Sequence, residues 1–305
     1  MKKRPLRGSL MLLTAAIIWG SAFVAQSEGM AYVEPFTYNA VRTLLGGIVL
    51  IPIIFLMRYF GRSQPREPID RKQTVLGGIC CGIILCAASS FQQAGIKETT
   101  AGKAGFITAL YVVIVPAFSI ALRKKPPAAV WLCIAGAVAG FYLLCIREDF
   151  TLGRGDLLVL ICAFIFALHI MAVDHFCEKH TDPAVMSCIQ FFTAGIFLTV
   201  CMLLFESPKA ERIFAARNTI LYAGILSSGG GYTLQILGQR ETSPTAATLL
   251  MSLESVFAAL SGWLFLHEQL SLKEGIGCAL VLASVIAAQL LTAGSQKSRN
   301  GEQAS

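Results

Sequence analysis

Long apolar runs separated by short polar segments make up most of the chain. A helix that crosses the hydrocarbon core of a bilayer, about 30 Å thick, needs about 20 apolar residues at about 1.5 Å each. Ten runs approach or reach this length, and each predicts a membrane-spanning helix. Their limits are 10–31, 36–58, 74–95, 104–122, 128–146, 156–176, 183–205, 219–238, 245–266 and 272–292.

Composition supports a membrane environment. Of the 305 residues, 55% are hydrophobic and only 14% are charged, and the mean hydropathy is +0.66. An average soluble domain is about 25% charged. The sequence therefore predicts an all-α integral membrane protein that contacts the lipid bilayer. The start of the chain, MKKRPLRGSLMLLTAAIIWGSAFVA, has the basic and apolar regions of a signal peptide, but it lacks a clean cleavage site of small residues, so we favour a first span.

The net charge of +7 lies mostly in short loops between the apolar runs. With the N-terminus inside, the inner segments hold about twice as many Lys and Arg residues as the outer ones. This bias predicts a multi-pass protein of the cytoplasmic membrane with both termini in the cytoplasm, and it explains the positive charge without a nucleic-acid partner. The polar segment 294–305 is expected to be a disordered cytoplasmic tail.

The chain lacks the motifs of common enzymes and metal sites. Nine of its ten cysteines lie inside apolar runs, without CxxC or Cys/His spacing, so we expect no metal, no cofactor and no structural disulfide. GxxxxGK[ST], HExxH, GxSxG and GxGxxG are absent. The chain is therefore not predicted to be an enzyme, and ATP-driven transport by this chain alone is not expected.

Two segment pairs indicate an internal repeat. KETTAGKAGFITALY (97–111) resembles RETSPTAATLLMSLE (240–254) at an offset of 143, and GSLMLLTAAIIWG (8–20) resembles GDLLVLICAFIFA (155–167) at an offset of 147. These offsets predict halves 1–146 and 147–293 with five spans each. An odd number of spans inverts the second half, and inverted repeats with a midplane site recur in secondary transporters.

Four motifs carry a family resemblance over nearly the whole chain. They are IIWGSAFVAQ, EPFTYNAVR, AGFITALYVVIVP and LLMSLESVFAALSGWLFLHEQLS. Together they resemble the EamA-like branch of the drug/metabolite transporter superfamily. The resemblance implies ten helices in two inverted halves around a central cavity, in a bacterial cytoplasmic membrane. It also implies small-molecule substrates such as amino acids or their derivatives, most often exported by alternating access. One departure is Ser255, where the family usually has Pro, so the kink expected of that Pro is in doubt.

Glu254 lies near the middle of the ninth run. A carboxylate at the bilayer centre costs about 3 kcal/mol, so it must face protein or a wet cavity. It either accepts protons or contacts substrate, or it bonds to a neighbouring helix. The repeat pairs it with Tyr111, which either lines the cavity or is an ordinary packed residue, and we expect the two to meet at the interface of the halves.

Six further residues are candidates for the cavity, each with a packing alternative. Arg42 either snorkels outward or binds an anionic group, and His169 is either a packed core residue or a proton relay. The other four are Trp19, Gln93, Tyr232 and Gln235. The Gly229–Gly231 run beside Tyr232 predicts a broken or kinked helix.

The main prediction is a secondary transporter of a small metabolite, either ion-coupled or facilitative. The alternatives are a membrane-embedded lipid-modifying enzyme, which would cluster acidic or His groups at one interface, and a lipid or glycolipid flippase, which would need a lateral opening. The spacings Gly78-x-x-x-Gly82 and Gly136-x-x-x-Gly140 permit close helix packing and leave a monomer and a homodimer open.

Overall fold

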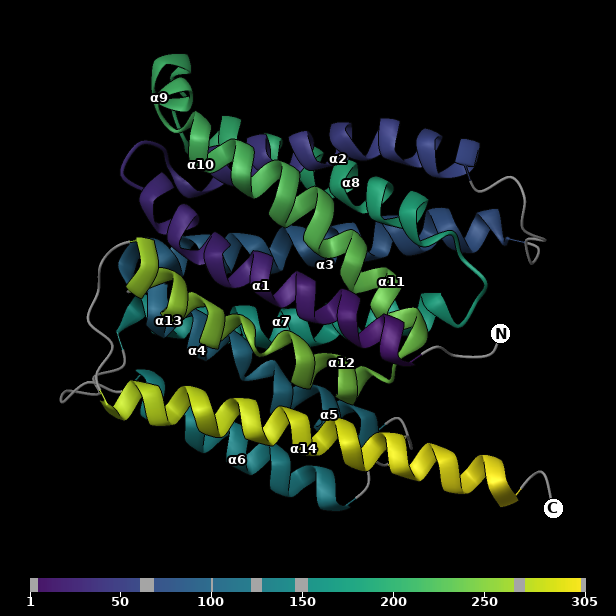
Figure 1. Cartoon of the computed structure of the whole chain (residues 1–305). Helices are drawn as coiled ribbons and strands as arrows, with labels where there is room; N and C mark the ends of the chain where they lie inside the picture. Colours follow the sequence, from purple (N-terminus) through teal and green to yellow (C-terminus); the bar gives the residue numbers. More distant parts are fainter. Residues whose placement is uncertain are drawn as a thin grey trace.

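The computed structural model describes residues 5–60, 69–99, 101–121, 128–145, 153–265 and 272–302, and the regular structure in these ranges is helical (Figure 1). The first half contains α1 (Pro5–Gly29), α2 (Pro35–Phe60), α3 (Arg71–Glu98), α4 (Ala101–Ala109), α5 (Tyr111–Ala121) and α6 (Ala128–Cys145). The second half contains α7 (Arg154–Cys177), α8 (Pro183–Phe205), α9 (Ala210–Ala215), α10 (Arg217–Leu221), the π-helix η1 (Tyr222–Tyr232), α11 (Thr233–Glu241), α12 (Pro244–Met251), α13 (Glu254–Phe265) and α14 (Leu272–Glu302).

Six described helical stretches are long and apolar enough to cross a bilayer. They are Leu6–Gly29, Pro35–Leu56, Arg71–Glu98, Arg154–Cys177, Pro183–Phe205 and Pro244–Leu264, and three shorter apolar helices are Ala104–Ile120, Ala128–Leu143 and Gly275–Ala288. The helical path from Arg217 to Glu241 includes η1. The chain is therefore an all-α, multi-pass membrane protein, while the arrangement of ten spans in inverted halves stays a prediction. The helix α14 includes residues 294–302 of the segment expected to be disordered.

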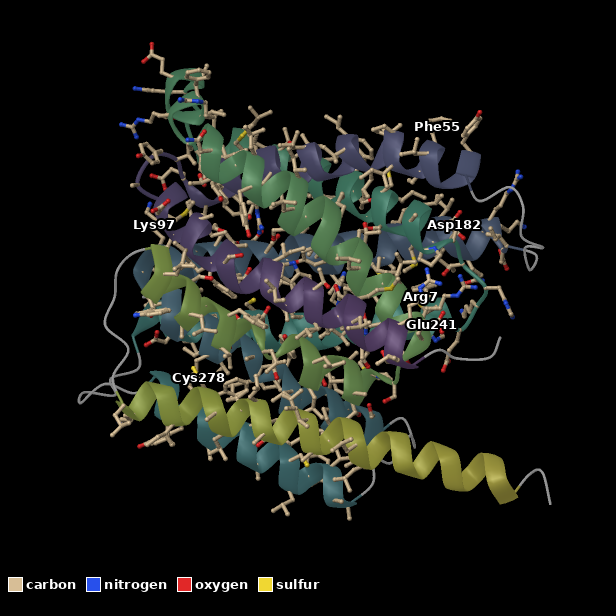
Figure 2. The ribbon with its side chains drawn as sticks, in the orientation of Figure 1. Arg7, Phe55, Lys97, Asp182, Glu241 and Cys278 are labelled. Atoms are coloured by element: carbon tan, nitrogen blue, oxygen red, sulfur yellow. The ribbon has the colours of Figure 1, made fainter. Side chains whose placement is uncertain are left out.

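Polar and apolar groups are distributed as a bilayer requires. Figure 2 shows Arg7, Asp182 and Glu241 near one end of the helices and Lys97 near the other. Large apolar side chains point outward along the helices, and Phe55, near the end of α2, is 68% exposed. Such a band would be an aggregation-prone surface in water, but it is the expected surface of a protein surrounded by lipid. In Figure 1, α1 begins and α14 ends on the same side of the helices.

Local sequence signals set where several helices begin. Asp70 precedes α3 and accepts a hydrogen bond from the Gln73 backbone N–H at 3.0 Å. Asp182 precedes Pro183 in the same way at α8, and Ser243 precedes Pro244 at α12. A side-chain acceptor before the first turn satisfies a free backbone N–H, and Pro at the first helical position has no N–H to satisfy.

Glycine allows the closest helix contacts. The helices α2 and α3 pack along α8, α3 also packs along α7, and α6 packs along α14. A Cβ atom at Gly82 would lie 2.7 Å from the Gln190 carbonyl oxygen, and one at Gly140 would lie 2.8 Å from the Gly277 carbonyl oxygen. Both small-residue spacings therefore serve packing within the chain, as is usual between membrane helices.

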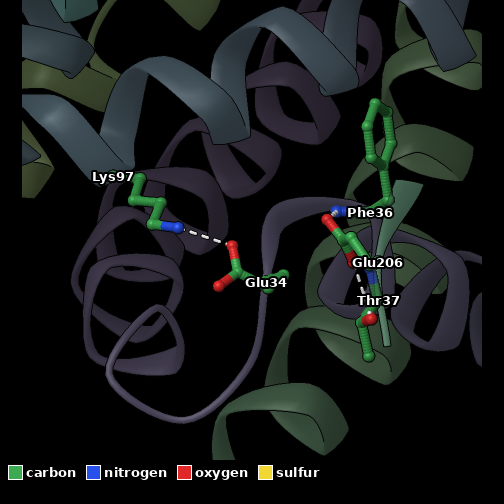
Figure 3. A network of polar contacts seen from close by, with 5 residues as sticks. All are labelled: Glu34, Phe36, Thr37, Lys97 and Glu206. Carbon is green, nitrogen blue, oxygen red and sulfur yellow. Dashed lines mark hydrogen bonds and ion pairs between the residues drawn. The ribbon is translucent and has the colours of Figure 1, made fainter. Parts of the chain in front are cut away.

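Ionic contacts join helix ends that are distant in the sequence (Figure 3). Glu206 follows α8, and its two carboxylate oxygens accept the backbone N–H groups of Phe36 and Thr37, each at 2.7 Å. Its charge lies at the positive end of the α2 dipole, which favours an anion. Beside it, the Lys97 ammonium at the end of α3 pairs with the Glu34 carboxylate just before α2. These contacts join the start of α2 to the ends of α3 and α8.

Replacement of Glu206 by Ala is expected to destabilise the protein by about 1–2 kcal/mol, because it leaves two N–H groups of α2 without a charged acceptor. The measurement is thermal unfolding of the purified protein in detergent. The control is Glu211→Ala, since Glu211 is exposed on the short helix α9. Equal melting temperatures for the two variants would show that the α2–α8 contact contributes nothing.

Candidate functional site

Two apolar helical stretches are broken at equivalent positions of the sequence repeat. One break is at Leu110, between α4 and α5, and the other is at Ser252 and Leu253, between α12 and α13. In both, a tight turn replaces the α-helical bond: the Leu110 N–H donates to the Ile107 carbonyl and the Leu253 N–H to the Leu250 carbonyl, each at 3.2 Å. Each break creates a new helix N-terminus inside the apolar region.

The first residues of the two new helices contact each other. Tyr111 begins α5 and Glu254 begins α13. The Tyr111 hydroxyl donates to Glu254 Oε1 at 3.0 Å, and both side chains are buried. The contact expected from the repeat is therefore present. The N-terminus of α13 also places the positive end of its dipole next to the carboxylate.

A cavity of about 40 Å³ adjoins this pair. About 10–15 Å³ of such space holds one water molecule, so the cavity has room for about three. Six of the eight candidate residues line it: Trp19, Arg42, Tyr111, Tyr232, Gln235 and Glu254. The other lining residues were not candidates from the sequence; they are Phe23, Gln26, Gln92, Thr108, Phe166, Ile170, Ser227 and Met251.

Arg42 does not snorkel to the surface. Its side chain is 4% exposed and lines the cavity. Nε donates to Asn39 Oδ1 at 2.8 Å, and the guanidinium lies 5.9 Å from the centre of the Tyr38 ring. Within the part of the chain that the structure describes, no carboxylate lies within 4.0 Å of it. A buried cation without an anionic partner is costly, so this guanidinium favours an anionic group in the cavity.

Two amide oxygens at the cavity lack donors. In the described ranges, neither Gln26 Oε1 nor Gln235 Oε1 has a hydrogen-bond partner, although both residues are buried. A buried acceptor without a donor costs about 1–3 kcal/mol. The cavity therefore offers unpaired acceptors as well as the Glu254 carboxylate. Gln26 closes the motif IIWGSAFVAQ, which was the available sequence signal for it.

Aromatic rings form much of the cavity wall. The Trp19 and Tyr232 ring centres are 4.9 Å apart, and Tyr232 also contacts Phe191 edge-on at 5.5 Å. Trp19 Nε1 donates to the Ser227 carbonyl at 3.2 Å, so the indole N–H of this partly buried tryptophan has an acceptor.

Gln93 and His169 are the two candidates that do not line the cavity. Gln93 Nε2 donates to the Gln26 carbonyl at 3.3 Å, while the adjacent Gln92 lines the cavity. His169 Nε2 and Gln190 Oε1 are 3.1 Å apart, between α7 and α8. Phe166 and Ile170, on either side of His169 in α7, line the cavity instead. Successive helical residues point about 100° apart, so the apolar run alone did not determine which face looks inward.

Comparison with known proteins identifies the family. The model of the EamA-like transporter family matches residues 6–146 and residues 153–288. The chain belongs to this family. An uncharacterized transporter of Archaeoglobus fulgidus is 30% identical, covering 93% of this chain and 86% of its own. The uncharacterized transporter YoaV of Bacillus subtilis is 21% identical, covering 90% and 94%.

Two further proteins are similar to this chain. The WAT1-related protein At3g02690, chloroplastic, of Arabidopsis thaliana is 24% identical, covering 90% of this chain and 67% of its own. A solved crystal structure matches with a TM-score of 0.74 at 21% identity and covers 93% of this chain and 96% of that one, which shows the shared fold. The family and its members' names make this chain a membrane transporter.

Replacement of Tyr111 by Phe is expected to lower stability by about 1–3 kcal/mol, because the buried Glu254 loses its hydroxyl donor while the ring volume is kept. Thermal unfolding in detergent measures the change. Tyr142→Phe is the matched control, since Tyr142 is exposed on α6. If both variants melt at the same temperature, the Tyr111–Glu254 bond adds no stability.

Proposed function

We propose that the chain is a secondary transporter that exports a small zwitterionic metabolite across the cytoplasmic membrane by alternating access. The observation that carries this proposal is the contact between Tyr111 and Glu254. It joins one broken helix from each half at the wall of a cavity. The Arg42 guanidinium and the Glu254 carboxylate both line this cavity. Discontinuous membrane helices that meet at the repeat interface form the binding sites of many secondary transporters.

Helix packing supports two inverted halves. Under the repeat, α1 corresponds to α7, α2 to α8, and α3 to the path through η1 and α11. The contacts of α3 with α7 and α8 have counterparts in the contacts of η1 with α1 and α2. The helix α2 packs on its own equivalent α8, and α6 packs on its equivalent α14. This exchange of partners is the pattern that a pseudo-twofold axis produces, and the two separate family matches agree with it.

The charges of the cavity favour a zwitterionic substrate. Arg42 is a donor-only group without a carboxylate partner in the described residues, so it suits the carboxylate of a ligand. Glu254, Gln26 and Gln235 supply acceptors, which suit an ammonium group. The rings of Trp19 and Tyr232 add faces that attract a cation. One small molecule with both groups would satisfy all of these side chains.

The cavity is small in this conformation. A volume of about 40 Å³ is far below the roughly 300–1,000 Å³ of a drug-sized pocket. Substrate entry therefore requires the half-helices to move apart. The breaks at Leu110 and at Ser252–Leu253 leave α5 and α13 free of continuous hydrogen bonding to α4 and α12, so they are natural points for such a movement.

A flippase is the second candidate, and one observation bears on it. An apolar groove of about 690 Å³ lies beside α5 and α6, lined by Val113, Trp131, Ile134, Ala135, Val138, Ala139, Tyr142 and Leu143. It shares no lining residue with the cavity. A lipid headgroup would need a route that joins the groove to the cavity. The separation of the groove from the cavity therefore favours transport of a soluble metabolite over lipid transfer.

The test is flux in proteoliposomes across a panel of zwitterions and their decarboxylated amines, with and without a pH gradient. We expect saturable flux that the gradient drives. Glu254→Gln is expected to reduce gradient-driven flux at least tenfold, because the amide cannot exchange a proton. The exposed Glu211→Gln is the control. Flux in Glu254→Gln that still responds fully to the gradient would contradict a coupling role for Glu254.

Arg42 is tested by substrate choice. Arg42→Gln is expected to raise the KM for zwitterions about tenfold or more and to leave the KM for the matching amines nearly unchanged. A hydrogen bond to a charged group contributes about 1.5–3 kcal/mol, and 1.4 kcal/mol corresponds to about tenfold. An equal effect on zwitterions and amines would show that Arg42 does not bind the carboxylate.

A further inference from the structure

The π-helix η1 is the most irregular long element of the described chain, and one side of it touches the cavity. It covers Tyr222–Tyr232 and continues without a break into α11. Its N–H groups reach carbonyls five residues back rather than four, so each turn holds about one residue more than an α-helical turn. Such segments are rare in proteins, and those that occur often lie at functional sites. Ser227 and Tyr232 of η1 and Gln235 of α11 line the cavity.

The helical register of η1 decides where these side chains point. If one π turn relaxed to an α turn, every residue after it would shift by about one position, which is about 100° of rotation. Tyr232 and Gln235 lie at and just after the end of η1, so such a shift would carry them off the cavity wall. The element therefore needs a contact that favours the π form.

Trp19 supplies such a contact. Its Nε1 donates to the Ser227 carbonyl within η1 at 3.2 Å, and its ring packs on Tyr232 at 4.9 Å. A Cβ atom at Gly231 would lie 2.5 Å from Trp19 Nε1, so the indole fits only because residue 231 has no side chain. The neighbouring glycines differ: a Cβ at Gly230 would meet nothing closer than 3.8 Å, and one at Gly229 nothing closer than 3.5 Å.

The same turn of α1 also touches the break at Glu254. Gly20 follows Trp19, and a Cβ atom there would lie 2.6 Å from the Glu254 carbonyl oxygen. The helix α1 thus packs against η1 through Trp19 and against α13 through Gly20. The two irregular parts of the cavity wall in the second half, η1 and the break before α13, therefore both pack against adjacent residues of α1, Trp19 and Gly20.

We infer that Trp19 is a positioning residue whose indole, seated on Gly231 and bonded to the Ser227 carbonyl, holds η1 in its π-helical register and so keeps Tyr232 and Gln235 in the cavity wall. The flux arm of its test rests on the proposed transport function. The hydrogen-exchange arm is independent of any substrate.

The first experiment is amide hydrogen exchange of the purified protein, followed in peptides that cover residues 222–235. Trp19→Phe keeps an aromatic ring but loses the N–H donor. We expect exchange about three- to tenfold faster in these peptides and unchanged exchange in α3 and α8. Trp263→Phe is the control, because Trp263 is 54% exposed on α13. Unchanged exchange of residues 222–235 in Trp19→Phe would overturn the inference.

The second experiment compares two identical substitutions at adjacent positions, Gly231→Ala and Gly230→Ala. Both remove the same backbone freedom, but only the first adds a methyl group against the indole. We expect Gly231→Ala to reduce flux at least tenfold and to speed exchange in residues 222–235, with Gly230→Ala within twofold of the wild type in both. Similar behaviour of the two variants would contradict the role of Trp19. If Gly231→Ala does not fold, the exchange of Trp19→Phe decides.

Discussion

The structure depends on one constraint: a carboxylate placed in the apolar centre of a membrane protein must have a polar environment of its own. A charge there costs about 3 kcal/mol on insertion scales, and more if it faces lipid. Glu254 meets this requirement at the N-terminus of a half-helix, with a tyrosine hydroxyl 3.0 Å away and a small cavity beside it. The break before α13 is thus part of the same solution, because a continuous helix would offer no free N-terminus at that depth.

The helix break before α13 forms although residue 255 is Ser. The family resemblance leads one to expect Pro at this position, and a Pro would force a kink. Here the break at Ser252 and Leu253 is present without it. The Ser255 N–H donates to the Ser252 carbonyl at 3.2 Å, and its hydroxyl donates to the Gly105 carbonyl in α4 at 3.0 Å. The hydroxyl of Ser255 therefore links this break to the other broken helix.

The cavity combines two electrostatic features that membrane interiors seldom hold. Arg42 is buried without a carboxylate partner among the described residues, and two glutamine oxygens lack donors. A buried guanidinium without an anionic partner is costly in a structural core, whereas unpaired amide oxygens also occur at Gln93 and Gln239, which do not line the cavity. The buried Arg42 beside a space with room for about three water molecules is therefore the physical basis for a binding site. The irregular helix η1, seated on Trp19, completes the wall on the side of the second half.

The sequence by itself determined that the protein lies in a bilayer and that Tyr111 and Glu254 are paired across the repeat. Long apolar runs of low charge required a bilayer, and an offset of 143 residues was enough to bring Tyr111 to Glu254. Only the tertiary structure decided which face of each helix looks inward. Gln92 lines the cavity and Gln93 does not, and Phe166 lines it while His169 contacts Gln190. In an apolar run every position is hydrophobic enough to face lipid or protein, so the run does not show which face of the helix points inward. The rotational orientation of each helix is set by close packing at sites such as Gly82, Gly140 and Gly231, where the neighbouring helix leaves no room for a side chain.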